Sequence, residues 1–378
     1  MTVAEEADFI IIGAGIAGSS VAAELAADGR RVLLVEAEQQ PGYHTTGRSA
    51  AIFAPTYGPA PIRALTRASE AFFTSPPAGF SDHPLLSHRD ILMIARPDQI
   101  AALDALIDEV GGYADISRLE VHEVYARQPL LRDGYAVAGM LDAGGHDIDV
   151  DALLQGYLRR FRAEGGRLVA GAGASDLRRD AGLWRVNAGG REYAAPVVIN
   201  AAGAWADEVG ALAGAGEIGL VPKRRTAVII AAPEDVETDH LPLTVDVDEK
   251  FYLKPESGRL LISPADETPT PPCDVQPEEL DIAICVDKIE RAFDLSVRRV
   301  ENSWAGLRSF VGDKVPVVGF SARAEGFFWL AGQGGYGIQT APAMARLAAA
   351  LAQGKQPPAD IIDEGLDMAA MSSARLGV

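Results

Sequence analysis

Residues 9–36 alternate between fully apolar runs and a helical pattern. The runs FIII (9–12) and RVLLVE (31–36) are typical of short buried strands, and the second run ends on an acid. Between them, a glycine turn from Gly13 to Gly18 leads into SSVAAELAA (19–27), which predicts a small-residue helix closed by Gly29. A complete strand–helix–strand unit therefore opens the chain.

Later segments predict further helices and strands. Helical patterns cover residues 62–73, 99–110, 146–166 and 278–294, with Asp149 or Asp151 as the expected cap of the third helix. Strand patterns cover residues 167–171, 183–189, 196–203 and much of 220–264, where FYLKPESGRLLIS predicts a hairpin turning at Pro255 to Gly258. Residues 327–351 repeat the opening design of apolar strand, glycine turn and small-residue helix.

Charge and composition narrow the possible partners. The 378 residues carry a formal net charge of −19, with 34 Lys and Arg against 53 Asp and Glu. Such a chain is a poor partner for nucleic acid or for an anionic membrane surface. The N-terminal MTVAEEAD lacks the features of a signal peptide, and no apolar stretch approaches the length of a membrane span. We expect a cytoplasmic protein with no nucleic acid partner and no integral membrane segment.

Metal and disulfide chemistry are disfavoured by the same sequence. Cys273 and Cys285 are its only cysteines, with no CxxC pattern or histidine cluster nearby. The stretch DIDVD (147–151) imitates the start of a calcium loop, but Ala152 and Leu158 stand where that loop needs a glycine and a bidentate acid. We expect no metal site, and helix capping explains these aspartates better.

The glycine turn has the spacing of a dinucleotide-binding motif. Gly13 permits the tight turn, Gly15 lets backbone amides approach a pyrophosphate, and Gly18 allows close packing of helix and strand. Glu36 ends the second strand, where a carboxylate accepts hydrogen bonds from a ribose hydroxyl and repels a 2′-phosphate. These residues disfavour NADP and leave NAD and FAD open.

Three longer segments resemble the D-amino-acid oxidase-like flavoprotein family. They are PGYHTTGRSAA (41–51), VVINAAGAW (197–205) and GQGGYGIQTAPA (332–343). The chain is most similar to the bacterial D-arginine dehydrogenase branch, through PGYHTTGRSAA, GYLRRFR, PKRR, FYLKP, WAGLRSF and GGYGIQT. The resemblance implies FAD, and because neither cysteine lies in a motif for covalent attachment, we expect FAD to be bound non-covalently.

The resemblance also implies which residues hold the cofactor. The loop around Arg48 is expected against the isoalloxazine edge, INAAG (199–203) beneath the pyrophosphate, and the second glycine turn at the pyrimidine side of the flavin. A helix beginning near Thr340 would stabilise the anionic reduced flavin. The expected cofactor-binding residues are Gly13, Gly15, Ala17, Gly18, Glu36, Ala37, Thr45, Thr46, Gly47, Arg48, Ser49, Ala50, Ala51, Ile52, Ala174, Ala202, Gly203, Gly334, Gly335, Tyr336, Gly337, Ile338 and Gln339.

The expected fold class is α/β with an α+β insert: a Rossmann-like FAD-binding domain and a discontinuous antiparallel-sheet substrate domain. The two dinucleotide-type ends lie at opposite ends of the chain, so the second domain is inserted in pieces. We expect the FAD-binding domain to comprise residues 1–85, 146–219 and 311–378. The substrate domain would comprise residues 86–145 and 220–310.

Two arginines match family positions that bind a substrate carboxylate. They are Arg225 in PKRRTAV and Arg308 in WAGLRSF, and a bidentate guanidinium suits a carboxylate better than lysine does. Tyr57 and Tyr252 match family tyrosines around the substrate. With Gly335, these residues form the expected catalytic site.

Two departures from the D-arginine branch concern the substrate side chain. Ile52 stands where that branch has a histidine, and Ile91 stands where it has a glutamate that binds the guanidinium. The neighbouring Asp90 is a doubtful substitute, because adjacent residues of a strand face opposite ways. We therefore expect Ile52 and Ile91 to line a side-chain pocket that prefers apolar over cationic substrates.

The predicted reaction is FAD-dependent oxidative deamination of D-amino acids. Hydride transfer from Cα to flavin N5 needs no base at the carbon, and the imine then hydrolyses to a 2-oxo acid and ammonia. His44 and His88 are expected to be structural or solvated, not catalytic. The alternatives are a glycine- or sarcosine-type secondary-amine oxidase of the same family and a non-catalytic flavin-binding redox protein. Oxygen and a quinone both remain open as the electron acceptor.

Overall fold

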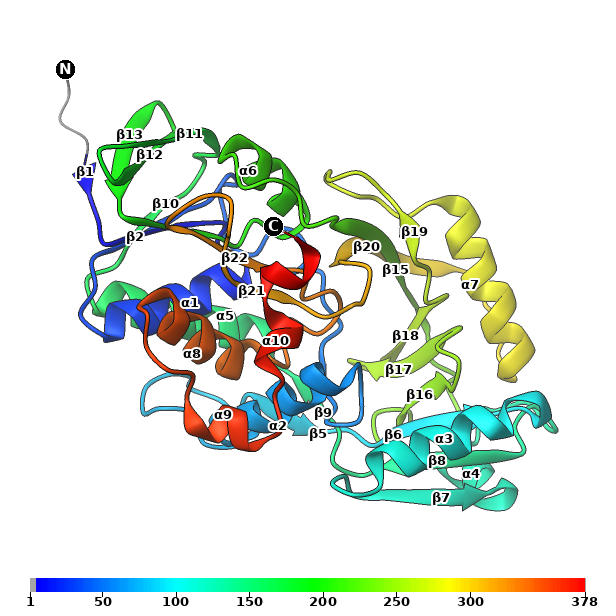
Figure 1. The fold of residues 1–378 in the computed structure, drawn as a ribbon. Helices are drawn as coiled ribbons and strands as arrows, with labels where there is room; N and C mark the ends of the chain where they lie inside the picture. Colours follow the sequence, from blue (N-terminus) through cyan, green and yellow to red (C-terminus); the bar gives the residue numbers. More distant parts are fainter. Residues whose placement is uncertain (1–4, 378) are drawn as a thin grey trace.

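A six-stranded sheet assembled from distant parts of the chain organises the first of two lobes (Figure 1). This computed structural model describes residues 5–377. The strand order is β10–β3–β2–β14–β22–β21, and only β21 runs antiparallel to its neighbour. The strands are β2 (Phe9–Ile12), β3 (Val32–Val35), β10 (Arg167–Val169), β14 (Val197–Asn200), β21 (Val317–Phe320) and β22 (Phe327–Ala331).

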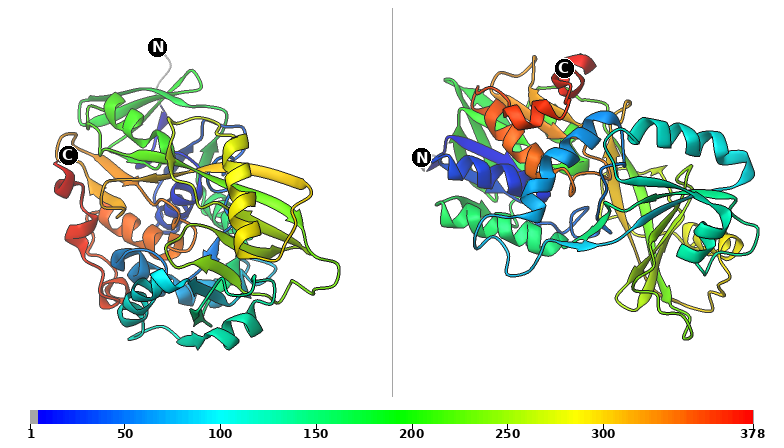
Figure 2. Two further views of the ribbon diagram at one scale, coloured as in Figure 1. Left: turned by 90° about the vertical axis from the view of Figure 1, so that its right-hand side faces the viewer. Right: turned by 90° about the horizontal axis from the view of Figure 1, so that it is seen from below.

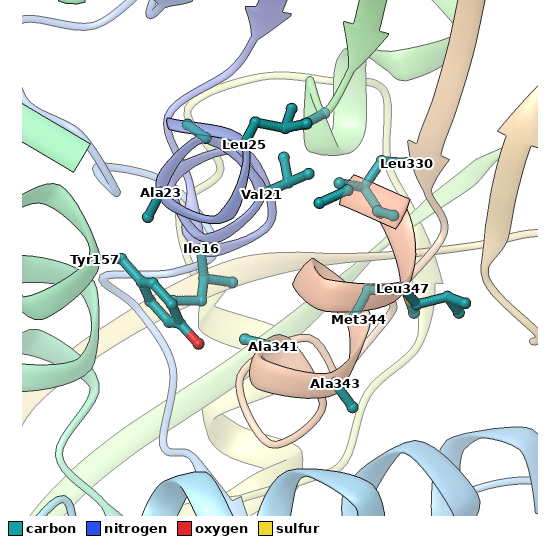
Figure 3. Close-up of a cluster of buried hydrophobic side chains, with 14 of the residues drawn as sticks. Ile16, Val21, Ala23, Leu25, Tyr157, Leu330, Ala341, Ala343, Met344 and Leu347 are labelled. Atoms are coloured by element: carbon teal, nitrogen blue, oxygen red, sulfur yellow. The ribbon is translucent and has the colours of Figure 1, made fainter. Parts of the chain in front are cut away.

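Helices cover one face of this sheet, as Figure 3 shows for the side chains between α1, α5 and α8. Ile16 and Val21 of α1 lie there with Met344 and Leu347 of α8, beside Tyr157 of α5. Small residues along α1 let the helix pack closely on its neighbours. The helices of this layer are α1 (Ile16–Ala27), α2 (Ala60–Thr74), α5 (Val150–Ala163), α8 (Ala341–Ala352), α9 (Ala359–Asp363) and α10 (Met368–Met371).

The opposite face packs against a small sheet and a short helix. Ile10 and Leu33 share a buried cluster there with Trp184 and Tyr193. The small sheet has the order β1–β13–β12–β11. Its strands are β1 (Glu5–Glu6), β11 (Ala174–Asp180), β12 (Leu183–Ala188) and β13 (Arg191–Ala195), and the helix is α6 (Ala206–Leu212). With both faces covered, the strands β2 and β3 are fully buried, as their unbroken apolar runs predict.

A nine-stranded sheet forms the second lobe, which the view from below in Figure 2 (right) separates clearly from the first. Its order is β19–β15–β18–β17–β16–β6–β8–β7, with β20 along β15, and only β16 and β6 pair in parallel. The strands are β6 (Ile91–Ala95), β7 (Ile116–Glu120), β8 (Ala138–Asp142), β15 (Val221–Ala231), β16 (Leu243–Asp246), β17 (Tyr252–Glu256), β18 (Arg259–Ser263), β19 (Thr268–Pro269) and β20 (Val300–Phe310). Its helices are α3 (Ile100–Val110), α4 (Val121–Arg127) and α7 (Glu279–Ala292).

A three-stranded sheet of β4 (Ile52–Phe53), β9 (His146–Ile148) and β5 (Leu86–His88) lies at the junction of the lobes. The α/β fold class with a largely antiparallel second sheet is confirmed, whereas the exact domain boundaries stay a prediction. None of the helices in residues 5–377 is long and apolar enough to cross a bilayer.

Several element boundaries differ from the prediction. The helical segment predicted from residue 146 begins with strand β9, and α5 starts after Asp149, whose carboxylate caps it by accepting from the amide of Ala152. The hairpin turns at Ser257 and Gly258, because Pro255 is still paired with Leu260.

Candidate active site

Three neighbouring hollows share lining residues and form one path from the first lobe to the space between the lobes. We call them the dinucleotide cavity (around Gly13 and Glu36), the central cavity (around Ser49 and Gly335) and the apolar cavity (around Ile91). The dinucleotide cavity shares Gly15 and Thr46 with the central cavity, which shares Arg308 and Gly335 with the apolar cavity. The three have empty volumes of about 1170, 980 and 790 Å³. The apolar cavity then opens, past Tyr57, into an outer cleft between the second lobe and α2. An elongated ligand can therefore extend from the first lobe to the second.

The dinucleotide cavity is built by backbone at the start of α1. Gly13 has φ +100°, and a Cβ there would lie 2.4 Å from the carbonyl oxygen of Ala201. A Cβ on Gly18 would lie 1.8 Å from the carbonyl oxygen of Gly13, so both positions exclude any side chain. Glu36 is 9% exposed, and its carboxylate accepts from the amide of Ala14 at 2.6 Å. These contacts bring β2, the glycine turn and Glu36 together at the N-terminus of α1. The free backbone amides and the dipole at a helix N-terminus favour binding of a pyrophosphate.

The central cavity is also lined by the second glycine turn. A Cβ on Gly335 would lie 2.7 Å from Nη1 of Arg308, so a side chain there would push this guanidinium from its place in the cavity. The turn leads into α8, whose N-cap is Thr340. Neither cysteine lines the three cavities. FAD joins a planar ring system to a dinucleotide. The central cavity lies next to the dinucleotide cavity and near the N-terminus of α8, so the donor set and the space fit this cofactor.

Arg308 projects from β20 into the space shared by the central and apolar cavities. Its Nη1 donates to the hydroxyl of Tyr57 at 3.3 Å, and no carboxylate among residues 5–377 forms an ion pair with it. Burial raises the pKa of Tyr57, although the charge of Arg308 opposes this, so the phenol stays protonated at neutral pH. A guanidinium enclosed without an anionic partner creates a site for an anionic ligand.

Arg225 lines the same two cavities and the outer cleft but is partly engaged by the chain. Its Nε donates to the carbonyl of Asp266 at 2.9 Å, and its Nη2 lies 3.5 Å from a carboxylate oxygen of Glu267. The structure thus brings both predicted arginines to one site. Arg308 carries the uncompensated charge.

Aliphatic side chains form the far wall of the apolar cavity. Ile52 and Ile91 line it as expected, and Met93, Leu243 and Val245 complete the wall. Asp90 does not line it: its carboxylate lies 3.0 Å from His88 and 3.2 Å from Arg127. Asp90 precedes β6, and its carboxylate pairs with these two side chains instead of entering the cavity.

Most of the expected cofactor residues line these cavities. Those at the dinucleotide cavity are Gly13, Gly15, Glu36, Ala37, Thr45, Thr46, Ala174, Ala202 and Gly203. Those at the central cavity are Ala17, Arg48, Ser49, Ala50, Gly334, Gly335, Gly337 and Ile338. Ala51 and Ile52 line the apolar cavity with Tyr57, Arg225, Tyr252 and Arg308. One connected site thus contains residues from both ends of the chain.

Other expected residues lie beside the site rather than on its surface. Gly18 and Gly47 line none of the cavities, and each lies against backbone that a side chain would displace. Gln339 accepts from the amide of Ala54, and Tyr336 lines the outer cleft. Arg48 lines the central cavity, but its guanidinium bonds Asp274 and the carbonyls of Val275 and Ala305.

Sequence reasoning missed part of the lining. Met93, Leu243, Val245 and Glu249 line the apolar cavity, and Ser309 and Gln333 line the central one. The alternation of Leu243 and Val245 marks one face of a strand, but only the folded sheet shows that this face meets the cavity. His44 lies at the dinucleotide cavity, 2.9 Å from Glu38.

Comparison with known proteins decides the family. Residues 8–351 match the family model described as DAO, FAD dependent oxidoreductase. The chain belongs to this family. It is therefore an FAD-dependent oxidoreductase, and its placement in the D-arginine dehydrogenase branch stays a prediction.

Two sequence relatives and one solved structure are similar to this chain. The uncharacterized oxidoreductase YurR of Bacillus subtilis is 25% identical, over 93% of this chain and 96% of that protein. Mitochondrial dimethylglycine dehydrogenase of Rattus norvegicus is also 25% identical, over 95% of this chain but 44% of its own length. The crystal structure of glycine oxidase from Geobacillus kaustophilus has a TM-score of 0.84 at 22% identity, covering 98% of this chain and 99% of that one. That similarity shows the shared fold.

Proposed function

We propose that this protein oxidatively deaminates D-amino acids with apolar side chains, using non-covalently bound FAD. The observation that carries the proposal is Arg308, a guanidinium without an anionic partner among residues 5–377 at the junction of the central and apolar cavities. A ligand carboxylate there would complete the charge pair and fix its own Cα between the two cavities. An electron carrier without turnover has no need of such a group.

The apolar wall supports the choice of side chain. Ile91 is 2% exposed and lies among aliphatic side chains, so a cationic substrate side chain placed against this wall would lose its water without a carboxylate in the wall itself. Glu249 also lines the cavity, but it is an exposed residue that the outer cleft shares. Methyl and methylene groups placed on this wall each contribute about 0.8 kcal/mol through burial. The preference for the D-enantiomer rests on the resemblance to the D-arginine branch.

FAD, when bound, supplies the two-electron acceptor for the hydrogen on the substrate Cα. The chain orients the substrate: Arg308 binds the carboxylate, with Tyr57 and Tyr252 beside it, and the aliphatic wall holds the side chain. Protonated Tyr57 can donate to the same carboxylate. The ammonium proton leaves to water, so the site needs no strong base. The imine product is then released and hydrolysed to a 2-oxo acid and ammonia.

Glycine or an N-methylated glycine such as the secondary amine sarcosine is the second candidate substrate. The protein with the 0.84 TM-score is a glycine oxidase, and a curated relative is a dimethylglycine dehydrogenase. Glycine and its N-methyl derivatives carry the same carboxylate for Arg308, but they leave the wall around Ile91 and Met93 without contact. We rank them second because an apolar cavity of this composition gains nothing from a substrate without a side chain.

An anaerobic experiment tests the proposal. Single D-amino acids, L-amino acids, glycine and sarcosine are mixed with the yellow holoenzyme, and the flavin absorbance is followed. We expect rapid bleaching by D-valine, D-leucine and D-methionine and slow bleaching by D-arginine and D-lysine. Bleaching by sarcosine or glycine alone would favour the second candidate. No bleaching by any amine would overturn the carboxylate site, and admitting air after bleaching separates oxygen from another acceptor.

A further inference from the structure

Asp142 is a buried carboxylate that no part of the proposed reaction uses. It ends β8 and is 1% exposed, and it forms no ion pair within residues 5–377. Its Oδ1 accepts from the amide of Gly144 at 2.9 Å, and its Oδ2 accepts from the hydroxyl of Thr56 at 2.6 Å. Burial raises the pKa of Asp142, and these two hydrogen bonds oppose the rise. Burying a carboxylate without a cationic partner costs free energy, so the hydrogen bonds of Asp142 must have a structural or functional reason.

The partner of Asp142 belongs to the segment that carries Tyr57. Residues 54–58 connect β4 to α2, and Thr56 lines both the apolar cavity and the outer cleft. The segment is fixed at its ends as well: the amide of Ala54 donates to Gln339, and Nη1 of Arg63 donates to the carbonyl of Gly58. Tyr57 itself is held by its amide, which donates to the carbonyl of Ala54 at 3.1 Å, and by edge-on contact of its ring with Tyr336. The Thr56–Asp142 hydrogen bond adds a side-chain contact at the preceding residue.

Asp142 connects this segment to the apolar wall. It pairs with Ile91 across β6 and β8, so the carboxylate lies at the edge of the wall that faces the substrate side chain. A hydrogen bond to an ionised carboxylate is shorter and stronger than a neutral one. The bond therefore links the strand next to the wall with the segment that carries Tyr57.

We propose that Asp142 and Thr56 are positioning residues that hold the hydroxyl of Tyr57 against Arg308 and thereby set the affinity for the substrate carboxylate. This inference rests on the proposed carboxylate site but requires no turnover. Without the Thr56 hydroxyl, the segment between Ala54 and Gly58 keeps its end contacts but loses its central one. Tyr57 then keeps its amide bond to Ala54 and its ring contact with Tyr336, but its hydroxyl is held less closely against Arg308.

The test compares Thr56→Val, which keeps the shape and removes the hydroxyl, with Thr56→Ser, which keeps the hydroxyl. The probe is isovalerate, a branched carboxylate without the amine that reacts, and its Kd is read from the perturbed flavin absorbance of the holoenzyme. We expect Thr56→Val to raise the Kd about tenfold, the equivalent of one hydrogen bond to a charged group. Thr56→Ser should retain the wild-type Kd, and FAD content and Tm report whether either variant is damaged.

A double-mutant cycle with Tyr57→Phe separates positioning from direct contact. If Thr56 acts through Tyr57, Thr56→Val should add less than a twofold change once the Tyr57 hydroxyl is gone. Additive effects would overturn the proposal, because Thr56 would then contact the ligand itself. A wild-type Kd in Thr56→Val would also overturn it. Wild-type enzyme that binds isovalerate but is not reduced by D-amino acids would refute the proposed function and leave the cycle interpretable.

Discussion

The dinucleotide cavity and the apolar cavity are built in opposite ways. At the dinucleotide cavity the fit comes from backbone: Gly13 and Gly18 lie against carbonyl oxygens at distances that no Cβ tolerates. At the apolar cavity the fit comes from side chains, with Arg308 and Tyr57 on one side and the wall around Ile91 on the other. Backbone contacts suit a ligand that never changes, whereas side chains can be exchanged to suit another substrate.

Substitution should therefore act differently at the two cavities. A change in the glycine turn should remove the cofactor and with it every activity. A change in the apolar cavity should alter which substrate is used while the protein stays yellow. Four substitutions test this difference, beginning with the largest expected effect.

Gly18→Val should abolish FAD binding. The new Cβ would lie 1.8 Å from the carbonyl oxygen of Gly13, so α1 must move away from β2. The purified variant should be colourless or aggregated, and the flavin-to-protein absorbance ratio measures this. Gly112→Ala is the matched control, because a Cβ added there would have no atom within 4 Å. A yellow and active Gly18→Val protein would refute the backbone account of this cavity.

Arg308→Leu should lower kcat/KM by roughly a thousandfold while FAD stays bound, because two charge-assisted hydrogen bonds to the carboxylate are lost. Stopped-flow flavin reduction with D-leucine measures the effect. Arg298→Leu removes an exposed arginine from the same lobe and should leave the rate unchanged. An Arg308→Leu enzyme with normal kcat/KM would place the substrate carboxylate elsewhere, and Arg225 would then be the group to test.

Ile91→Glu should change the substrate preference. A carboxylate on this wall supplies the missing partner for a cationic side chain, so the ratio of kcat/KM for D-arginine over D-leucine should rise by about tenfold or more. Without substrate the new charge lies beside Asp142, so Tm should fall by a few degrees. Ile91→Val is the control and should leave the ratio near its wild-type value. An unchanged ratio in Ile91→Glu would mean that the substrate side chain lies elsewhere.

Sequence reasoning succeeded where the structure depends on local spacing. The first strand–helix–strand unit, its glycines and Glu36 lie within one short segment, and the turn before α8 repeats the same signal. Sequence reasoning missed contacts between distant segments. Thr56 and Asp142, for example, are 86 positions apart, and neither lies in a motif. The boundary of α5 failed for a related reason, because β9 forms only by pairing with β4 and β5.

Arg48 shows the same limit within a recognised motif. Its position between Gly47 and Ser49 indicated a flavin contact, yet its guanidinium reaches Asp274 and carbonyls of the second lobe. Tyr43 also donates to Asp274, so the segment around this aspartate is tied across the loop that lines the dinucleotide and central cavities. A side chain on a backbone-built cavity can thus serve to hold the two lobes together.

The smallest effect should come from removing the ion pair between Arg48 and Asp274. Asp274→Asn should speed FAD release about two- to fivefold, the range for an exposed ion pair, and high salt should narrow the difference from wild type. The hydrogen bond from Arg48 lowers the pKa of Asp274 below 3.8, so the folded state gains from this pair above that pH and loses it as pH falls through the lowered value. The rate of FAD release from the wild type, followed by flavin fluorescence, should therefore be independent of pH near neutrality and rise only in acid. Asp274→Asn should lack the part of this rise that comes from the ion pair. Equal release from both proteins at every pH and salt concentration would show that the backbone alone retains the cofactor.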